Sequence, residues 1–153
     1  MDLSRHIIDA TKEIFTSMVM MEVTAGEPGI DSPNPLRSSI TGAVGMAGSQ
    51  KGMLAIHIPN TVAMAITSNF LGMEINEINA DVQDAVGELA NMLAGSIKLV
   101  LSESASDIKL SLPTTIFGEE YTYQSGDDVD LVIIPFTVTE GRFLVELRME
   151  KES

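Results

Sequence analysis

The chain has 153 residues, of which 44% are hydrophobic and 20% are charged. Its 22 acidic residues outnumber the 9 basic ones, the net charge is −13, and cysteine is absent. The absence of cysteine excludes disulfides, thiolate metal sites and cysteine nucleophiles. The acidic balance argues against binding to nucleic acid or to an anionic membrane. We expect a single domain over residues 1–153 with its own hydrophobic core.

The sequence contains no candidate membrane or export segment. No apolar run approaches the roughly 18 residues that a membrane-spanning helix needs. Residues 1–15 carry charges throughout and lack the uninterrupted apolar stretch of a secretory signal. We therefore expect a cytoplasmic protein.

The first third of the chain predicts a helix followed by a hairpin. Apolar residues at helical spacing predict an amphipathic helix over residues 2–22. Three prolines and two glycines in residues 25–37 predict a surface loop. Alternating patterns then predict strands over residues 38–47 and 53–59. In the second strand His57 lies on the face opposite Leu54, Ile56 and Ile58 and is expected to be half-exposed. It is not expected to be a metal ligand, because it has no acidic or histidine neighbour.

Two helices are predicted after the hairpin. A short helix over residues 61–71 would have Asn60 or Thr61 as its N-cap and Gly72 as the residue that ends it. The longest helix is predicted over residues 79–104, with Asn79 as its N-cap.

The long helix has two contrasting faces when each residue turns it by about 100°. One face is an apolar stripe suited to burial: Val82, Val86, Leu89, Leu93, Ile97 and Val100. The opposite face is the polar stripe: Asp84, Glu88, Asn91, Gly95, Lys98 and Ser102. A polar stripe is typical of a solvated helix surface, but the order of these residue types makes it the place to look for function.

Within the polar stripe, Glu88 and Asn91 project from the same side of the helix because they are three residues apart. A carboxylate can pair with a cation, and a neutral carboxamide can orient a water molecule without titrating. Asn91 is a poor helix former, and Gly87 and Gly95 each cost on the order of 1 kcal/mol relative to alanine. Such departures without a packing gain are typical of functional sites. We interpret the two glycines as clearance for a partner surface.

The C-terminal part predicts β structure. Residues 108–112 predict a strand that ends at Pro113, with short, irregular β structure after it. Residues 131–139 and 142–150 predict a hairpin that turns at Glu140-Gly141.

In the last predicted strand, alternate residues are expected to face the core or the solvent. Those facing the core are Phe143, Val145, Leu147 and Met149. Those facing water are Glu146, Arg148 and Glu150. Together, the predicted elements indicate an α+β domain with helices packed on one antiparallel sheet.

Most catalytic constellations are missing from the sequence. Neither histidine lies in a motif that would nominate a Ser-His-Asp set, and no glycine-rich phosphate loop is present. Asp127, Asp128 and Asp130 lack the ligand spacing of a calcium loop. We interpret these three carboxylates as a solvated turn and expect no metal site.

The segment DAVGELANMLAG (84–95) places Asp84, Glu88 and Asn91 in the pattern D-x-x-x-E-x-x-N, with Pro113 further along. This pattern resembles the signature helix of the CheC/CheX/FliY phosphatase family. The surrounding segments KGMLAIHIP, NTVAMAITSNFLG and LPTTIFGEEY follow the family's order, so the resemblance covers nearly the whole chain. CheC and FliY types typically carry two such helices, whereas this chain has one, which is most like the CheX type.

The resemblance implies a fold and a quaternary structure. The fold is a CheC-like α+β domain, an antiparallel sheet with two long helices and one short helix packed on one face. The CheX type also implies a homodimer whose sheets join across the subunits.

The resemblance further implies hydrolysis of the aspartyl phosphate on a CheY-type response regulator. Glu88 would pair with the regulator's active-site lysine, and Asn91 would position the attacking water. Mg²⁺ would be bound by the regulator, so no cofactor is expected in this chain. Asp84 and Lys98 would lie at the rim of the partner surface and Gly95 would leave space for it.

Two other functions fit the same sequence. The chain could be a non-catalytic interaction module of a chemotaxis or flagellar-switch assembly. It could also be a dimeric sensory module with an internal small-molecule site, which a methionine-rich core permits. Only the phosphatase requires an amide at Asn91 beside Glu88.

Overall fold

A computed structural model of the chain describes residues 3–29, 33–101, 107–123 and 129–150. Its elements are α1 (Leu3–Ile14), the π-helical turn η1 (Phe15–Val19), β1 (Thr24–Ala25), β2 (Leu36–Gly48), β3 (Gly52–Pro59), α2 (Asn60–Leu71), α3 (Ala80–Leu101), β4 (Ile108–Leu110), β5 (Thr114–Tyr121), β6 (Val129–Val138) and β7 (Gly141–Glu150). The predicted α+β class is confirmed.

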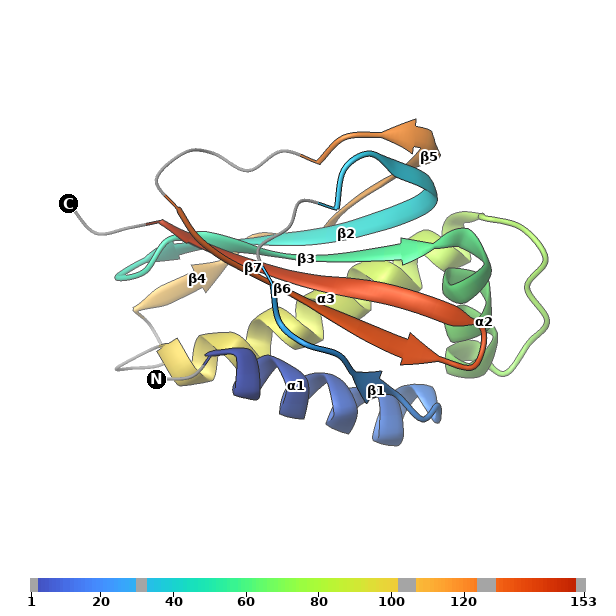
Figure 1. The fold of residues 1–153 in the computed structure, drawn as a ribbon, viewed down its shortest axis with the longest axis horizontal. Coiled ribbons are helices and arrows are strands. Elements are labelled where there is room, and N and C mark those ends of the chain that lie inside the picture. The colour runs from blue at the N-terminus through green and yellow to red at the C-terminus, as the bar shows by residue number, and fades with distance from the viewer. Residues whose placement is uncertain (1–2, 30–32, 102–106, 124–128, 151–153) are drawn as a thin grey trace.

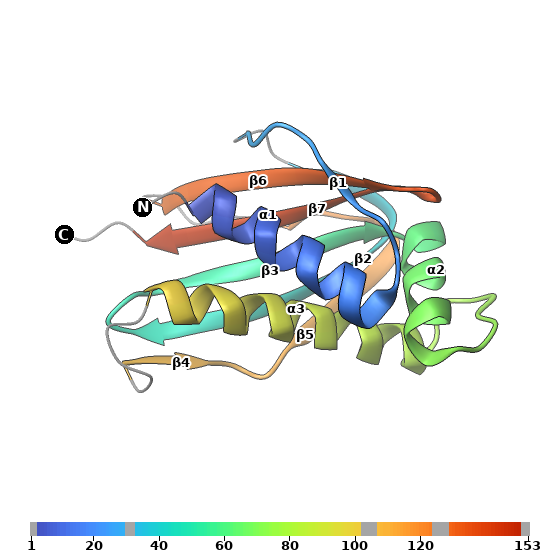
Figure 2. The same cartoon turned by 90° about the horizontal axis from the view of Figure 1, so that it is seen from below.

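Within the described residues, seven strands form one sheet in which every pairing is antiparallel. The strand order is β1-β6-β7-β3-β2-β4, and β5 also pairs with β2. Helices α1 and α3 lie against one face of the sheet, and α2 lies at the end where β3 finishes (Figures 1 and 2). This arrangement matches the predicted antiparallel sheet with helices on one face.

Strand β2 is the longest strand and pairs along both of its sides. Strand β3 follows one side, while β5 and β4 share the other. Residues 36–43 pair with β5 and residues 46–48 pair with β4. The strand-link, residues 111–113, lies between these two ladders. It is held there because the backbone N–H of Ser111 donates to the carbonyl of Gly45, at 2.9 Å.

Helix α3 packs directly on β2. Most of its apolar stripe is fully buried, as predicted: Val82, Val86, Leu89, Leu93 and Ile97. A Cβ atom added at Gly42 would lie 2.9 Å from Val86 Cγ1 and 3.0 Å from the Val86 carbonyl oxygen. The glycine on β2 therefore allows the close approach of helix and sheet.

The first helix is shorter than the predicted residues 2–22. It ends in the π-helical turn, and Met20 follows with a left-handed φ of 59°. Residues 1–2 lie outside the described part of the chain. The predicted loop over residues 25–37 is also partly wrong, because Thr24 and Ala25 pair with β6 and β2 begins at Leu36.

Two predicted positions, the N-cap of α2 and the turn of the final hairpin, differ from the structure by about one residue. Helix α2 begins at Asn60, and Pro59 occupies the cap position without a side-chain hydrogen bond, so the predicted N-cap is wrong. Gly72 ends the helix with a left-handed φ of 67°, as predicted. In the final hairpin Val138 pairs with Gly141, so the turn residues are 139 and 140.

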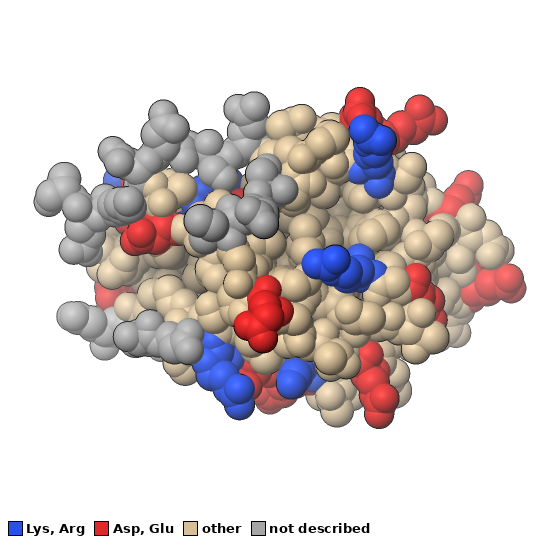
Figure 3. All heavy atoms as spheres, in the orientation of Figure 1, with Lys and Arg blue, Asp and Glu red and all other residues tan. Residues whose placement is uncertain are grey.

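Charged side chains are dispersed on the face seen in Figure 3. Lys and Arg side chains stand among Asp and Glu side chains and form no dense basic patch on this face. Within the described residues, no helix is long and apolar enough to cross a membrane.

Candidate functional site

Helix α3 begins at a well-formed cap. The backbone N–H of Val82 donates to the Asn79 side-chain oxygen at 3.1 Å, which confirms Asn79 as the N-cap. Such a cap contributes about 1 kcal/mol to helix stability. The helix is described to Leu101, so the predicted end at residue 104 and the stripe member Ser102 lie outside the described residues.

The remaining polar stripe faces away from the core. Asp84 and Glu88 are exposed, and Asn91, Gly95 and Lys98 are partly exposed. The side chains predicted for chemistry are thus accessible to a partner. The docking role of Glu88 and the water-positioning role of Asn91 stay predictions.

A groove of about 350 Å³ lies between α3 and the start of β5. Its lining residues are Gln83, Asp84, Gly87, Glu88, Pro113 and Thr115. The structure therefore brings Asp84 and Glu88 to one groove. Asn91, Gly95 and Lys98 are not among its lining residues and continue along the exposed side of α3.

The two glycines of α3 have different surroundings, although the sequence predicted clearance for both. Gly87 is buried, and a Cβ atom there would lie 3.5 Å from Pro113 Cβ. An added Cβ at Gly87 would thus make an ordinary van der Waals contact with this chain's own strand-link. A Cβ atom at Gly95 would meet no atom within 4 Å. Of the two glycines, only Gly95 leaves an added Cβ without a neighbour.

The charged side chains that line the groove are both carboxylates, so the groove favours a cationic group. Asn91 follows Glu88 by three residues, which places its amide one helical turn further along the same side. This combination can pair with a cation through Glu88 and orient a water molecule through Asn91. Among the described residues, no cluster of three or more His, Asp or Glu side chains could hold a metal ion.

Sequence reasoning did not include Gln83 and Thr115 in the site. Gln83 directly precedes Asp84, but the polar stripe was selected by helical spacing and left it out. Thr115 comes from β5, and Pro113 brings that strand beside α3. The end of the predicted strand at Pro113 was the available signal, since proline interrupts a β ladder.

A second polar cluster lies on the sheet face opposite α3, and the exposure of its residues was predicted incorrectly. His57, Glu146 and Arg148 were expected to be exposed or half-exposed, but their relative exposures are 1%, 1% and 9%. They are covered because Tyr123 packs edge-on against the His57 ring, with centroids 5.1 Å apart. The Asn34 side chain holds Tyr123 in place through hydrogen bonds of 2.6 and 2.7 Å to its backbone.

The buried cluster forms a connected network. His57 Nε2 lies 2.9 Å from Glu146 Oε1, and His57 Nδ1 lies 2.8 Å from Thr41 Oγ1. Thr41 also contacts the Tyr121 hydroxyl at 2.8 Å. Glu146 Oε2 is 3.8 Å from Arg148 Nε. One assignment satisfies this path: Tyr121 donates to Thr41, Thr41 donates to His57, and His57 donates to Glu146.

The two tyrosines of this region have raised pKa values. Burial raises the pKa of Tyr121 above its usual 10.0, partly offset by the hydrogen bond to Thr41. Burial also raises the pKa of Tyr123, while the Arg148 charge lowers it and the Glu146 charge raises it. Desolvation disfavours the phenolate in both cases.

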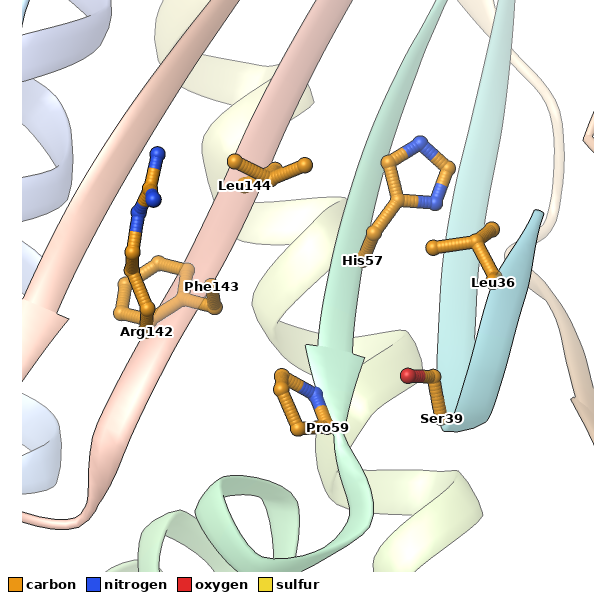
Figure 4. A pocket seen from close by; sticks show the side chains of 7 residues that line it. All are labelled: Leu36, Ser39, His57, Pro59, Arg142, Phe143 and Leu144. Atoms are coloured by element: carbon orange, nitrogen blue, oxygen red, sulfur yellow. The ribbon is translucent and has the colours of Figure 1, made fainter. Parts of the chain in front are cut away.

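A hollow of about 250 Å³ lies beside the network (Figure 4). His57 and Leu144 line it from neighbouring strands, and Arg142 comes from the start of β7. Both ring nitrogens of His57 already have partners within the chain. His57 therefore has no ring nitrogen left for a ligand in this hollow.

A family model described as chemotaxis phosphatase CheX matches residues 40–137. The match spans more than half of the chain and includes α3 and both walls of the groove. The chain belongs to the CheX family. The CheY-P phosphatase CheX of Thermotoga maritima is 25% identical over 120 residues, which cover 78% of this chain and 77% of the relative.

Solved structures show the CheX fold over almost the whole chain. A CheC-like superfamily protein from Shewanella sp. PV-4 is 28% identical, with a TM-score of 0.87 and 98% of each chain covered. A chain in the CheX-CheY-BeF3-Mg²⁺ complex of Borrelia burgdorferi is 21% identical, with a TM-score of 0.82, and covers 98% of this chain and 99% of that one. The predicted CheC-like fold is confirmed.

Proposed function

We propose that this protein hydrolyses the aspartyl phosphate of a CheY-type response regulator and that α3 enters the regulator's active site. Membership of the CheX family and the CheY-P phosphatase of T. maritima support the reaction. The observation that carries the site assignment is the accessibility of Glu88 and Asn91 on one side of α3, beside an acidic groove.

Glu88 has the docking role in this proposal. Its carboxylate pairs with the lysine of the regulator's active site, and Asp84 in the same groove adds negative potential. Pairing between a carboxylate and an ammonium group is strengthened when docking excludes water. Lys98 lies further along α3, where it meets the rim of the regulator. Gly95 leaves space for the regulator's backbone.

Asn91 has the positioning role. Its side-chain oxygen accepts a hydrogen bond from a water molecule and aims it at phosphorus, opposite the aspartate oxygen that leaves. The water oxygen forms the new bond to phosphorus as the bond to the aspartate oxygen breaks. The products are inorganic phosphate, which keeps both protons of the water as H2PO4−, and the free aspartate carboxylate. Positioning of this kind can account for a large part of the acceleration.

Mg²⁺ belongs to the regulator in this proposal. A metal ion there neutralises charge on the phosphoryl oxygens during transfer. The chain's own residues then need only to dock, to orient water and to exclude bulk solvent. The B. burgdorferi complex of the same fold contains CheY, BeF3 and Mg²⁺ together.

The test measures loss of phosphate from purified phosphorylated CheY-type regulators of the same organism. Wild type is expected to accelerate it, and Asn91→Ala to reduce kcat about a hundredfold while binding is retained. Asn69→Ala changes an exposed asparagine on α2 and should leave kcat unchanged. Equal rates with and without wild-type protein for every regulator would overturn the proposal and favour a non-catalytic interaction module.

We also propose that the protein acts in the cytoplasm as a homodimer. Among the described residues, β5 pairs only with β2, so its other side offers unpaired backbone groups to a second copy. Such a pairing would join two sheets, as expected for the CheX type. Sedimentation velocity should give the mass of two chains, and a monomer at all micromolar concentrations would contradict this.

A further inference from the structure

Two leucines near α3 are unusually exposed for their size. The relative exposure is 87% for Leu112 and 76% for Leu99, and these are the highest values among the exposed large hydrophobic residues that the structure describes. A single exposed leucine is common and needs no explanation. Here one leucine lies on α3 beyond Glu88 and Asn91 and the other directly precedes Pro113 of the groove, so both add exposed apolar surface to the candidate site, and such surface marks interaction sites.

Leu99 lies on the same side of α3 as Glu88. The two residues are 11 positions apart, which is about three helical turns and leaves their directions within about 20° of each other. Leu99 also follows Gly95 by one turn. An apolar side chain therefore continues the polar stripe towards the C-terminal end of α3.

Leu112 belongs to the strand-link, whose Pro113 forms part of the groove wall across from α3. Its neighbour Ser111 is tied to β2 because the Gly45 N–H donates to Ser111 Oγ at 2.9 Å. Its other neighbour, Pro113, lines the groove and lies against Gly87. Leu112 is thus held between two anchored residues while its own side chain stays in solvent.

We propose that Leu99 and Leu112 are the apolar anchors that seat the response regulator on α3. The proposal rests on the phosphatase function above and adds the residues that provide affinity. The occupant is the regulator face around its phosphorylated aspartate and active-site lysine, because the groove that Pro113 lines, directly after Leu112, carries the carboxylates of Asp84 and Glu88. A cationic group would enter the groove while apolar surface covers the leucines.

The proposal separates affinity from chemistry. Burial of an exposed leucine stabilises a complex whether or not the phosphoryl group is reacting, so it lowers KM without raising kcat. Loss of the water-positioning amide of Asn91 should instead lower kcat while binding of the regulator is retained. Interfaces commonly depend on a few such anchors surrounded by weaker polar contacts.

The experiment compares Leu99→Ala, Leu112→Ala and the double variant with wild type in steady-state dephosphorylation of the phosphorylated regulator. Each single variant should raise KM about tenfold with kcat within about twofold, as expected for loss of a buried anchor. The dissociation constant for the BeF3-treated regulator should rise in parallel. Leu71→Ala removes a leucine that is 46% exposed at the end of α2 and should change neither value.

Three results would overturn the inference. Unchanged KM in the double variant, with wild type active, would remove the two anchors but leave the proposed function intact. A fall in kcat at unchanged KM would assign the leucines to chemistry rather than seating. Loss of self-association with unchanged regulator affinity would assign them to contacts between copies of the chain. Inactive wild type would instead overturn the proposed function, and thermal denaturation confirms that the variants are folded.

Discussion

His57 Nε2 lies 2.9 Å from Glu146 Oε1 on the sheet face opposite α3, and both side chains are almost fully buried. Removal of Glu146 takes the acceptor from the buried His57 N–H and the counter-charge from Arg148, and breaking such a buried charged pair costs about 3–5 kcal/mol. Glu146→Ala should therefore lower the free energy of unfolding by about 3 kcal/mol. Urea denaturation measures the change.

The control for Glu146→Ala is Glu150→Ala, on the same strand and the same side but exposed. An exposed substitution of this kind is expected within about 0.5 kcal/mol of wild type. Equal stability of the two variants would show that the network contributes little. Phosphatase kcat should be preserved in folded Glu146→Ala, since the network is remote from α3.

The alkaline titration of the protein should report the same region. The chain contains 2 tyrosines and no tryptophan, so phenolate absorbance comes only from Tyr121 and Tyr123. Burial raises both pKa values above 10.0, so the folded state holds these protons more tightly than the unfolded state. Their contribution to stability is complete below the unfolded pKa and is lost as pH rises through the folded pKa.

Spectrophotometric titration should thus give inflections above 10.0 in native protein and near the ordinary value in urea. Tyr121→Phe and Tyr123→Phe each remove one phenol and assign the two inflections. A native inflection at or below the ordinary tyrosine pKa would contradict the burial of these side chains.

Gly42→Ala tests the close approach of β2 and α3. The added methyl group would lie 2.9 Å from Val86 Cγ1 and 3.0 Å from a backbone oxygen, so the helix or the strand has to shift. Overpacking of this kind costs about 1–3 kcal/mol, measurable by urea denaturation. Gly45→Ala is the matched control on the same strand, because its nearest contact would be an ordinary 3.5 Å. Equal effects of the two substitutions would refute the role assigned to Gly42.

Gly95→Ala should separate stability from activity. The position lies within α3 and an added Cβ meets nothing within 4 Å, so helix propensity should raise stability by up to about 1 kcal/mol. If Gly95 provides clearance for the regulator, the same variant should lose phosphatase activity through a higher KM. Thermal denaturation and steady-state kinetics measure the two effects. A stabilised variant with unchanged KM would remove Gly95 from the partner surface.

The elements with one buried face could be predicted from local pattern. Helix α3 and strand β7 repeat their apolar residues at the helical and strand periods, and the Asn79 cap signals where α3 begins. The positions of Glu88 and Asn91 on the exposed side follow from the same periodicity. Turn and cap positions were off by about one residue because several neighbouring residues satisfy the same local geometry.

The parts that could not be predicted depend on distant segments. Glu146 and Arg148 alternate with apolar residues and so predict a solvated strand face. They are buried because residues 121–123 and Asn34 cover that face, and no local pattern encodes this contact. The groove was missed for the same reason, since its second wall is Pro113 and Thr115 from beyond α3.

Strands β4 and β5 pair with the same side of β2, and this arrangement has a consequence for binding of the response regulator. The strand-link is fastened at both ends to β2 through the ladders with β4 and β5, and β2 also supports α3 at Gly42. Both walls of the groove therefore rest on one strand, and their separation is set when the chain folds. If the response regulator docks at this groove as proposed, it would meet a preorganised surface, and no affinity would be spent on ordering the groove walls.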